Sequence, residues 1–162
     1  MRSMAALGLW LWLAAASPAQ IQSFTVTPGA LSFTAVDPDT GGPAPQTSQA
    51  VVVFRGSPSR YWTMSVQAET ASLENCGGVP ASAIEVGCQS ATLVGAGPGN
   101  AACNPAAIPL STTPQVVAQG RQGTQTNTLT VALQVSFADR WRYPATEAAA
   151  CTIQLRYTVD IP

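Results

Sequence analysis

The chain has 162 residues, of which only 9% are charged, and its formal net charge is −1. It contains no histidine and no lysine, so its seven basic residues are all arginine. Without a basic cluster to neutralise phosphates, we expect no nucleic-acid partner. Without His or Lys, the bases that usually activate serine and cysteine nucleophiles are missing, and the carboxylates are scattered along the chain. We therefore expect no catalytic residues and no enzyme activity.

Residues 1–19 have the pattern of a secretory signal peptide. A basic residue, Arg2, precedes a run of 13 mostly apolar residues that ends at Ala16. This run is shorter than the ~20 apolar residues that span a bilayer, so we expect no stable membrane insertion. The small residues that follow favour cleavage after Ala19, with cleavage after Ala16 as the alternative. We expect residues 20–162 to be exported, as a secreted, periplasmic or cell-surface protein.

The exported part has the length of one domain, and its apolar residues recur at every second position, the period of a half-buried strand. Strand-like segments in chain order are 23–28, 30–36, 48–55, 61–68, 128–137 and 151–161. Weaker candidates are 84–86, 91–94 and 115–118. Short strands separated by Gly/Pro turns predict a single all-β domain over residues 20–162, an immunoglobulin-like two-sheet antiparallel sandwich.

Three segments have one clearly apolar face. In segment 61–68 this face comprises Trp62, Met64, Val66 and Ala68, and in segment 128–137 it comprises Leu129, Val131, Leu133, Val135 and Phe137. We expect both sets in the core. Segment 151–161 alternates in the same way, with Cys151 in phase with its apolar residues. We expect segments 128–137 and 151–161 to pair antiparallel across the connection 138–150.

Four cysteines, Cys76, Cys88, Cys103 and Cys151, lie in the exported part. An even number of cysteines in an oxidising compartment predicts two disulfides, and the wide spacing without His argues against zinc. Three pairings are open. We favour Cys76 with Cys88, which closes a Gly-Gly loop, and Cys103 with Cys151, which ties a loop to a strand. Region 75–114 holds three of these cysteines and is rich in Gly, Ala and Pro, so we expect long loops there.

A cluster of two arginines and two aromatic residues follows segment 128–137: Arg140, Trp141, Arg142 and Tyr143. This composition is typical of binding hot spots and of sugar-stacking surfaces. The alternative is that Trp141 caps the core with the arginine stems packed over it. The acidic stretch DPDTGG at 37–42 is interpreted as a turn rather than a calcium site. We expect no metal and no other cofactor.

Three stretches carry a family resemblance: the opening VTPGALSF, the central SQAVVV with a following Trp, and the closing W-x-Y-P-A and CTIQLRYTV. As a strand pattern over most of the exported chain, they resemble bacterial exported immunoglobulin-like modules and fimbrial or spore-coat-type surface subunits. The resemblance implies a role at a bacterial surface or in an appendage, and it transfers no active site.

Two functions remain open, and we favour the first. In the first, the protein is a structural subunit of a fimbria-like, coat or surface assembly, in which a strand edge or the amino-terminal segment of one copy pairs with the next. In the second, it is a secreted monomeric module that binds carbohydrate or protein through Trp141, Tyr143 and the long cysteine-rich loops. A free segment 20–30 would favour assembly, whereas pairing of that segment together with an exposed Trp141 would favour binding.

Overall fold

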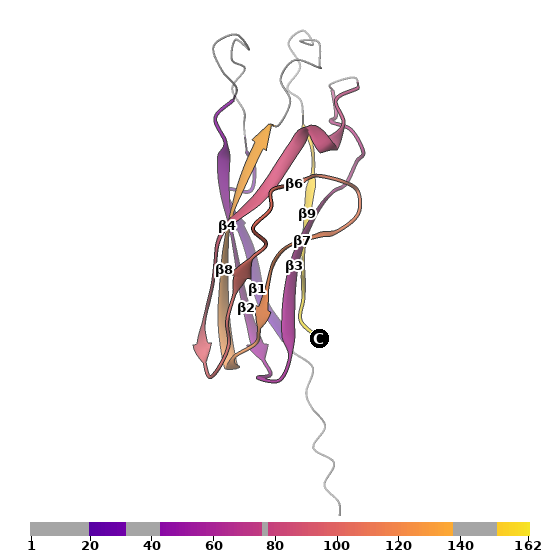
Figure 1. Cartoon of the computed structure of the whole chain (residues 1–162). Coiled ribbons are helices and arrows are strands. Elements are labelled where there is room, and N and C mark those ends of the chain that lie inside the picture. Colours follow the sequence, from indigo (N-terminus) through magenta and orange to yellow (C-terminus); the bar gives the residue numbers. More distant parts are fainter. Residues whose placement is uncertain (1–19, 32–42, 76–77, 138–151) are drawn as a thin grey trace, which may run out of the picture.

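The computed structural model describes residues 20–31, 43–75, 78–137 and 152–162. These residues form two antiparallel sheets, which confirms the predicted all-β class (Figure 1). One sheet has five strands in the order β1-β2-β8-β4-β6, and the other has four in the order β5-β7-β3-β9. The strands are β1 (Gln20–Thr27), β2 (Gln46–Gly56), β3 (Tyr61–Ala68), β4 (Ile84–Ala96), β5 (Ala102–Cys103), β6 (Ile108–Pro109), β7 (Gln115–Arg121), β8 (Thr124–Phe137) and β9 (Leu155–Asp160), with a 3-10 turn η1 (Ala81–Ala83) before β4.

The core lies between the two sheets and is built from the alternating apolar faces. Eight of the nine predicted core residues of β3 and β8 are buried: Trp62, Met64, Val66, Ala68, Leu129, Val131, Leu133 and Val135. The ninth, Phe137, is half-buried and packs against this core. Strand β2 contributes Ala50, Val52 and Phe54, which have no exposed surface. A slip of one residue in any of these strands would move its apolar set to solvent, so burial fixes the register. Within the described residues, no helix is long and apolar enough to cross a membrane.

Strands β8 and β9 do not pair, so the predicted hairpin across 138–150 is wrong. Strand β8 lies between β2 and β4, with Leu129 opposite Val52 on one side and Leu93 on the other. Strand β9 lies in the other sheet, next to β3. Alternation determines which face of a strand is buried but does not determine its neighbour. Strands that follow one another in sequence are neighbours in only about two-thirds of cases.

Region 75–114 is more regular than the long loops that we expected. Its two weak candidates, 84–86 and 91–94, belong to the single strand β4 of 13 residues. A β-bulge between Cys88 and Ser90 changes the phase of the side chains, which explains why the alternation breaks in the sequence. Of the expected strand 30–36, only residues 30 and 31 are described, and they are not in a strand.

One end of the sandwich is closed by a buried amide, Gln122, which has no exposed surface. Its Oε1 accepts a hydrogen bond from the Ser57 N–H at 2.9 Å, and its Nε2 donates to the Tyr61 carbonyl at 2.8 Å. The side chain therefore ties the β2–β3 turn to the β7–β8 turn. Because a buried amide costs stability unless it is hydrogen-bonded, these contacts fix how the two sheets meet at this end.

Candidate functional site

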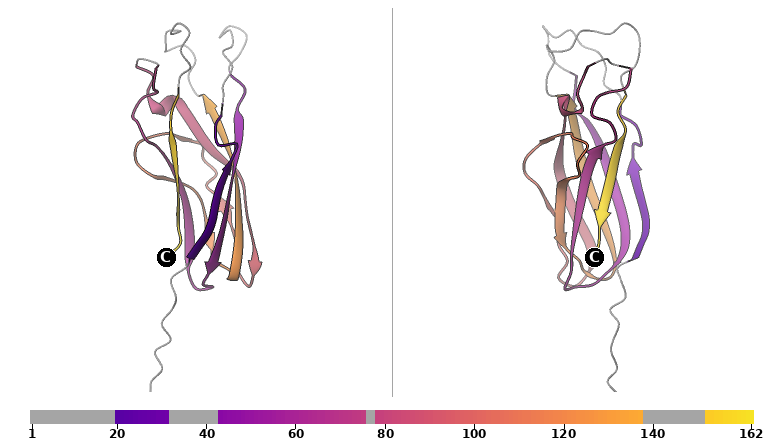
Figure 2. Two further views of the ribbon diagram at one scale, coloured as in Figure 1. Left: turned by 180° about the vertical axis from the view of Figure 1, so that it is seen from behind. Right: turned by 90° about the vertical axis from the view of Figure 1, so that its right-hand side faces the viewer.

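The end strands β1 and β9 lie on the same side of the sandwich. A disulfide joins Cys88 of β4 to Cys103 of β5, near the opposite ends of the two sheets. The remaining ends of the sheets are β1 and β9, the indigo and yellow strands that stand in front in the left view of Figure 2. Among the described residues, each has one paired edge and one edge without a partner strand.

The inward-facing side chains of these two strands form what we call the open seam: Ile21, Phe24 and Val26 of β1, with Leu155, Tyr157 and Val159 of β9. Their direction follows from their cross-strand partners. The three β1 residues lie opposite Phe54, Val52 and Ala50, which are all buried in the core. The three β9 residues lie opposite Ala68, Val66 and Met64, which are also buried.

The open seam leaves apolar surface uncovered. Ile21 is 44% exposed and Phe24 is 39% exposed, although their neighbours Phe54 and Val52 on the same face of the sheet are fully buried. The three β9 residues are half-buried. The four-stranded sheet therefore packs over the inner face of β2 but leaves part of the inner face of β1 exposed to solvent. Contiguous apolar surface of this kind is typical of an interaction site.

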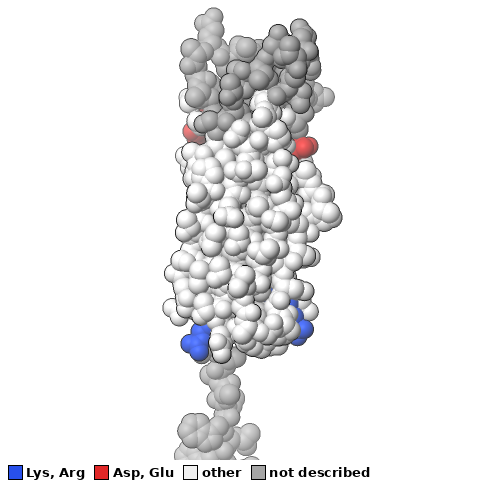
Figure 3. All heavy atoms as spheres, turned by 90° about the vertical axis from the view of Figure 1, so that its left-hand side faces the viewer, with Lys and Arg blue, Asp and Glu red and all other residues white. Residues whose placement is uncertain are grey.

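The edge of β1 has few of the features that usually prevent edge-to-edge pairing. Its eight residues, QIQSFTVT, include no charged residue and no proline. Its single irregularity is a β-bulge between Ile21 and Ser23. Natural proteins protect exposed edges with charges, prolines, bulges or short strands, and β1 has only the bulge. The face of the molecule in Figure 3 likewise carries charge near its two ends and none along the length between them.

A polar pair lies beneath the seam. Ser48 of β2 is 3% exposed, and its Oγ makes no hydrogen bond with the described residues. Burial raises the pKa of Tyr157, and the nearby Ser48 hydroxyl lowers that pKa in part. The two groups are thus close, but they do not meet the geometry of a hydrogen bond. A buried hydroxyl without a partner is uncommon in native proteins, so this part of the seam is incompletely satisfied.

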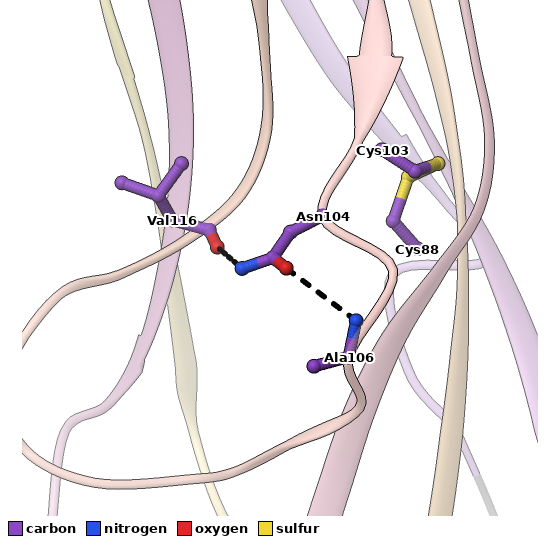
Figure 4. The surroundings of a disulfide bond; sticks show 5 residues. All are labelled: Cys88, Cys103, Asn104, Ala106 and Val116. Carbon is purple, nitrogen blue, oxygen red and sulfur yellow. Dashed lines mark hydrogen bonds between the residues drawn. A yellow bond between two sulfur atoms is a disulfide. The ribbon is translucent and has the colours of Figure 1, made fainter.

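The Cys88–Cys103 disulfide links the two sheets, with 5.3 Å between the Cα atoms (Figure 4). It shows that the favoured pairs, Cys76 with Cys88 and Cys103 with Cys151, are wrong. We expected Cys103 to lie in a loop, whereas it lies in the short strand β5 beside β4. Cys76 and Cys151 lie outside the described residues.

The side chain of Asn104 helps to hold the chain that follows β5. Its Nδ2 donates to the Val116 carbonyl at 3.1 Å, and its Oδ1 accepts from the Ala106 N–H at 3.4 Å (Figure 4). These contacts attach the segment after Cys103 to the β7 side of the four-stranded sheet. The disulfide side of the sandwich is therefore closed by covalent and polar contacts, in contrast to the open seam.

The predicted contact cluster, Arg140, Trp141, Arg142 and Tyr143, lies outside the described residues, as does the turn 37–42. The described residues contain no group of three or more His, Cys, Asp or Glu side chains that could hold a metal ion. Sequence reasoning missed Ile21 and Phe24. The Val-, Phe- and Thr-rich segment 23–28 indicates a strand, but the exposure of Ile21 and Phe24 depends on how far the opposite sheet extends, which no local pattern records.

Strand β1 bears directly on the two open functions. Residues 20–27 pair with β2, so they are not a free amino-terminal strand for a neighbouring copy. This pairing meets half of the condition that favours binding, and the other half, Trp141, lies outside the described residues. If copies of the chain assemble by strand pairing, the contact must therefore use the free edges of strands such as β1 and β9.

Comparison with protein-family models, with curated proteins and with solved structures found no match. Function is therefore inferred from the geometry of this chain.

Proposed function

We propose that the protein is a non-enzymatic, exported structural protein of the bacterial surface that self-associates through the open seam. It would serve as a subunit of a coat, fimbria-like or surface assembly. The observation that carries this proposal is the exposure of Ile21 and Phe24 on the inner face of an edge strand. An unpaired edge supplies main-chain hydrogen bonds to an added strand, and an uncovered apolar row supplies the burial that stabilises the contact. The signal-peptide pattern of residues 1–19 supports export.

The proposal includes an immunoglobulin-like sandwich with a second disulfide, between Cys76 and Cys151. Glu74 and Thr152 exchange two backbone hydrogen bonds, of 2.8 and 3.2 Å. This bridge joins the chain two residues before Cys76 to the chain one residue after Cys151. Because the other two cysteines are bonded to each other, this pairing is the one that remains. Peptide mapping of the non-reduced protein should yield a disulfide-linked peptide pair that contains both residues, and two free thiols would contradict it.

Light scattering of residues 20–162 over a concentration series tests self-association. We expect the mean mass of the wild type to rise with concentration. Phe24→Lys places a charge on the inner face at the seam and should keep the protein monomeric. Thr126→Lys adds the same charge at an exposed position of β8 and should assemble like the wild type. Circular dichroism checks that each variant is folded. A wild type that is monomeric at every concentration would overturn the proposal.

A second candidate function, a module that binds carbohydrate, is favoured by one specific feature. A shallow hollow of about 510 Å³ lies where β3 begins and β7 ends, and Tyr61, which lines it, is 66% exposed. Thr63, Gln119 and Arg121 also line it. The Arg121 Nε donates to the Pro58 carbonyl at 2.9 Å, which fixes the guanidinium. An exposed aromatic face beside hydrogen-bonding side chains suits a neutral sugar.

The indole of Trp62 reports on this hollow because its Nε1 donates to the Asn100 carbonyl at 3.2 Å beneath it. In residues 20–162 with Trp141→Phe, Trp62 gives the single indole signal in a ¹H–¹⁵N spectrum. Titration with cellohexaose or maltohexaose should shift this signal in a saturable way, with a Kd of roughly 0.1–1 mM for so open a site. The shift should vanish in Tyr61→Ala. No shift with either sugar would contradict the second candidate.

A further inference from the structure

We infer that the seam is covered by a second copy of the chain, related by a two-fold axis parallel to the strands, so that β1 of each copy pairs with β9 of the other. This inference rests on the proposed function and names its partner. It is carried by three features of the seam: the directions of its two strands, its apolar inner face and the absence of charge on β1.

The two strands of the seam run in opposite directions. Strand β1 starts at Gln20, opposite Arg55 at the end of β2. A short turn leads from there into β3, and Asp160 at the end of β9 lies opposite Thr63 near the start of β3. Strand β1 therefore begins at the end of the sandwich where β9 finishes (Figure 2).

A half-turn about an axis parallel to the strands keeps every strand direction and exchanges the two sheets. It brings β1 of one copy beside β9 of the other, and the two strands are antiparallel there. The same operation places β9 of the first copy beside β1 of the second. Each five-stranded sheet then continues into the partner's four-stranded sheet, and every pair in both sheets is antiparallel. One two-fold interface thus closes all four free edges of the seam, and two-fold dimers are the commonest oligomers.

The side chains suit this arrangement on both faces. The inward rows of the two copies meet, so Phe24 and Ile21 gain apolar neighbours from the partner copy's seam. On the outer face, β9 presents Arg156 and Asp160, and the uncharged β1 sets no like charge against either of them. The half-satisfied pair of Ser48 and Tyr157 would lie inside the enlarged core rather than at an open side.

The alternative is a two-fold axis perpendicular to the sheets, which would pair β1 with β1 and β9 with β9. That arrangement sets the two charged β9 strands side by side, each with Arg156 and Asp160 on its outer face. The axis parallel to the strands instead sets each β9 beside a β1 that carries no charge. We favour pairing of β1 with β9 on this ground.

Cross-linking distinguishes the two arrangements. Thr25 of β1 and Thr158 of β9 are exposed on the outer face, so Thr25→Cys and Thr158→Cys each add an accessible thiol without touching the core. The two variants are prepared separately, mixed, and treated with a short bismaleimide. We expect a cross-linked dimer in the mixture and none in either variant alone, because like positions lie on opposite faces of the dimer. Thr126→Cys mixed with Thr158→Cys is the control and should give no cross-link.

The outcomes separate this inference from the proposed function. A cross-link in Thr25→Cys alone would overturn the inference and leave the proposed function intact, because β1 would then pair with β1. Larger assemblies or dimers that give no cross-link in the mixture would also overturn the inference alone. A wild type that stays monomeric at every concentration would overturn both.

Discussion

The buried side-chain amide of Asn127 exchanges two hydrogen bonds with the backbone of Gly123. The Gly123 N–H donates to Oδ1 at 3.0 Å, and Nδ2 donates to the Gly123 carbonyl at 3.3 Å. Asn127 has no exposed surface, and a Cβ atom added at Gly56, Gly95 or Gly123 would overlap its amide. The amide is thus enclosed by three glycines at the end of the sandwich that Gln122 also closes.

Removal of this amide should destabilise the fold. Asn127→Ala leaves the N–H and the carbonyl of Gly123 without partners in a buried site, which should lower the free energy of unfolding by about 2–3 kcal/mol. Urea unfolding followed by fluorescence measures the change. Thr126→Ala, at the exposed neighbouring position, is the control and should change the free energy by less than about 0.5 kcal/mol. Equal effects of the two substitutions would contradict the assigned role of Asn127.

The glycines around Asn127 should be as sensitive as the amide itself. A methyl group in Gly95→Ala would overlap the Asn127 Oδ1, so we expect a loss of roughly 2 kcal/mol or more of unfolding free energy. Gly29 has no atom within 4 Å of an added Cβ, so Gly29→Ala is the matched control and should cost little. Comparison of the two melting temperatures tests this prediction, and it fails if Gly95→Ala melts with the wild type.

The disulfide between the sheets should contribute to stability through the unfolded chain. Cys88 and Cys103 are separated by 15 positions, and closing a loop of that length stabilises by about 3 kcal/mol on the chain-entropy model. The double variant Cys88→Ala, Cys103→Ala should lose about that amount in urea unfolding. Reducing agent should then have a smaller effect on the double variant than on the wild type. A double variant as stable as the wild type would show that the bridge adds nothing to stability.

The raised pKa of Tyr157 leads us to predict how the free energy of unfolding changes at alkaline pH. Burial raises its pKa in the folded state above the ordinary value of 10.0, so the fold favours the neutral phenol. This contribution is fully present below pH 10.0 and is lost as the pH rises from there through the folded-state pKa. The unfolding free energy of the wild type should therefore fall between about pH 9 and pH 11, and that of Tyr157→Phe should fall less. Urea unfolding at these two pH values decides between the outcomes, and parallel losses would contradict the burial of this phenol.

Local pattern predicted most of the longer strands and their buried faces, because each of them presents one face to the core, but it did not predict the two-residue strands β5 and β6. Trp62 and Leu129 illustrate this, since both lie in phase with their apolar neighbours and both are buried. Phe24 shows the limit. A bulge places Ile21 and Phe24 on the same face although they are three positions apart, which breaks the period of two. Their exposure then depends on the width of the other sheet, a property of the whole fold.

The sequence pattern also did not predict which strands are neighbours or which cysteines form a disulfide. Both β8 and β9 alternate clearly, yet alternation does not distinguish a central strand from an edge strand. Cys88 and Cys103 meet because β4 and β5 lie together on one side of the sandwich, a contact between different sheets. Asn127 gave no signal at all in its Thr- and Gln-rich segment, because its importance comes from the three glycines around it.

Hydrogen–deuterium exchange of the β1 amides as a function of protein concentration tests directly whether the free edge of β1 is an assembly surface. If a second copy covers the free edge of β1, those amides that do not bond to β2 should exchange quickly in dilute protein. They should exchange at least about tenfold more slowly in concentrated protein, and Phe24→Lys should abolish the difference. Exchange along β1 that is the same at every concentration would contradict the claim that this edge is an assembly surface.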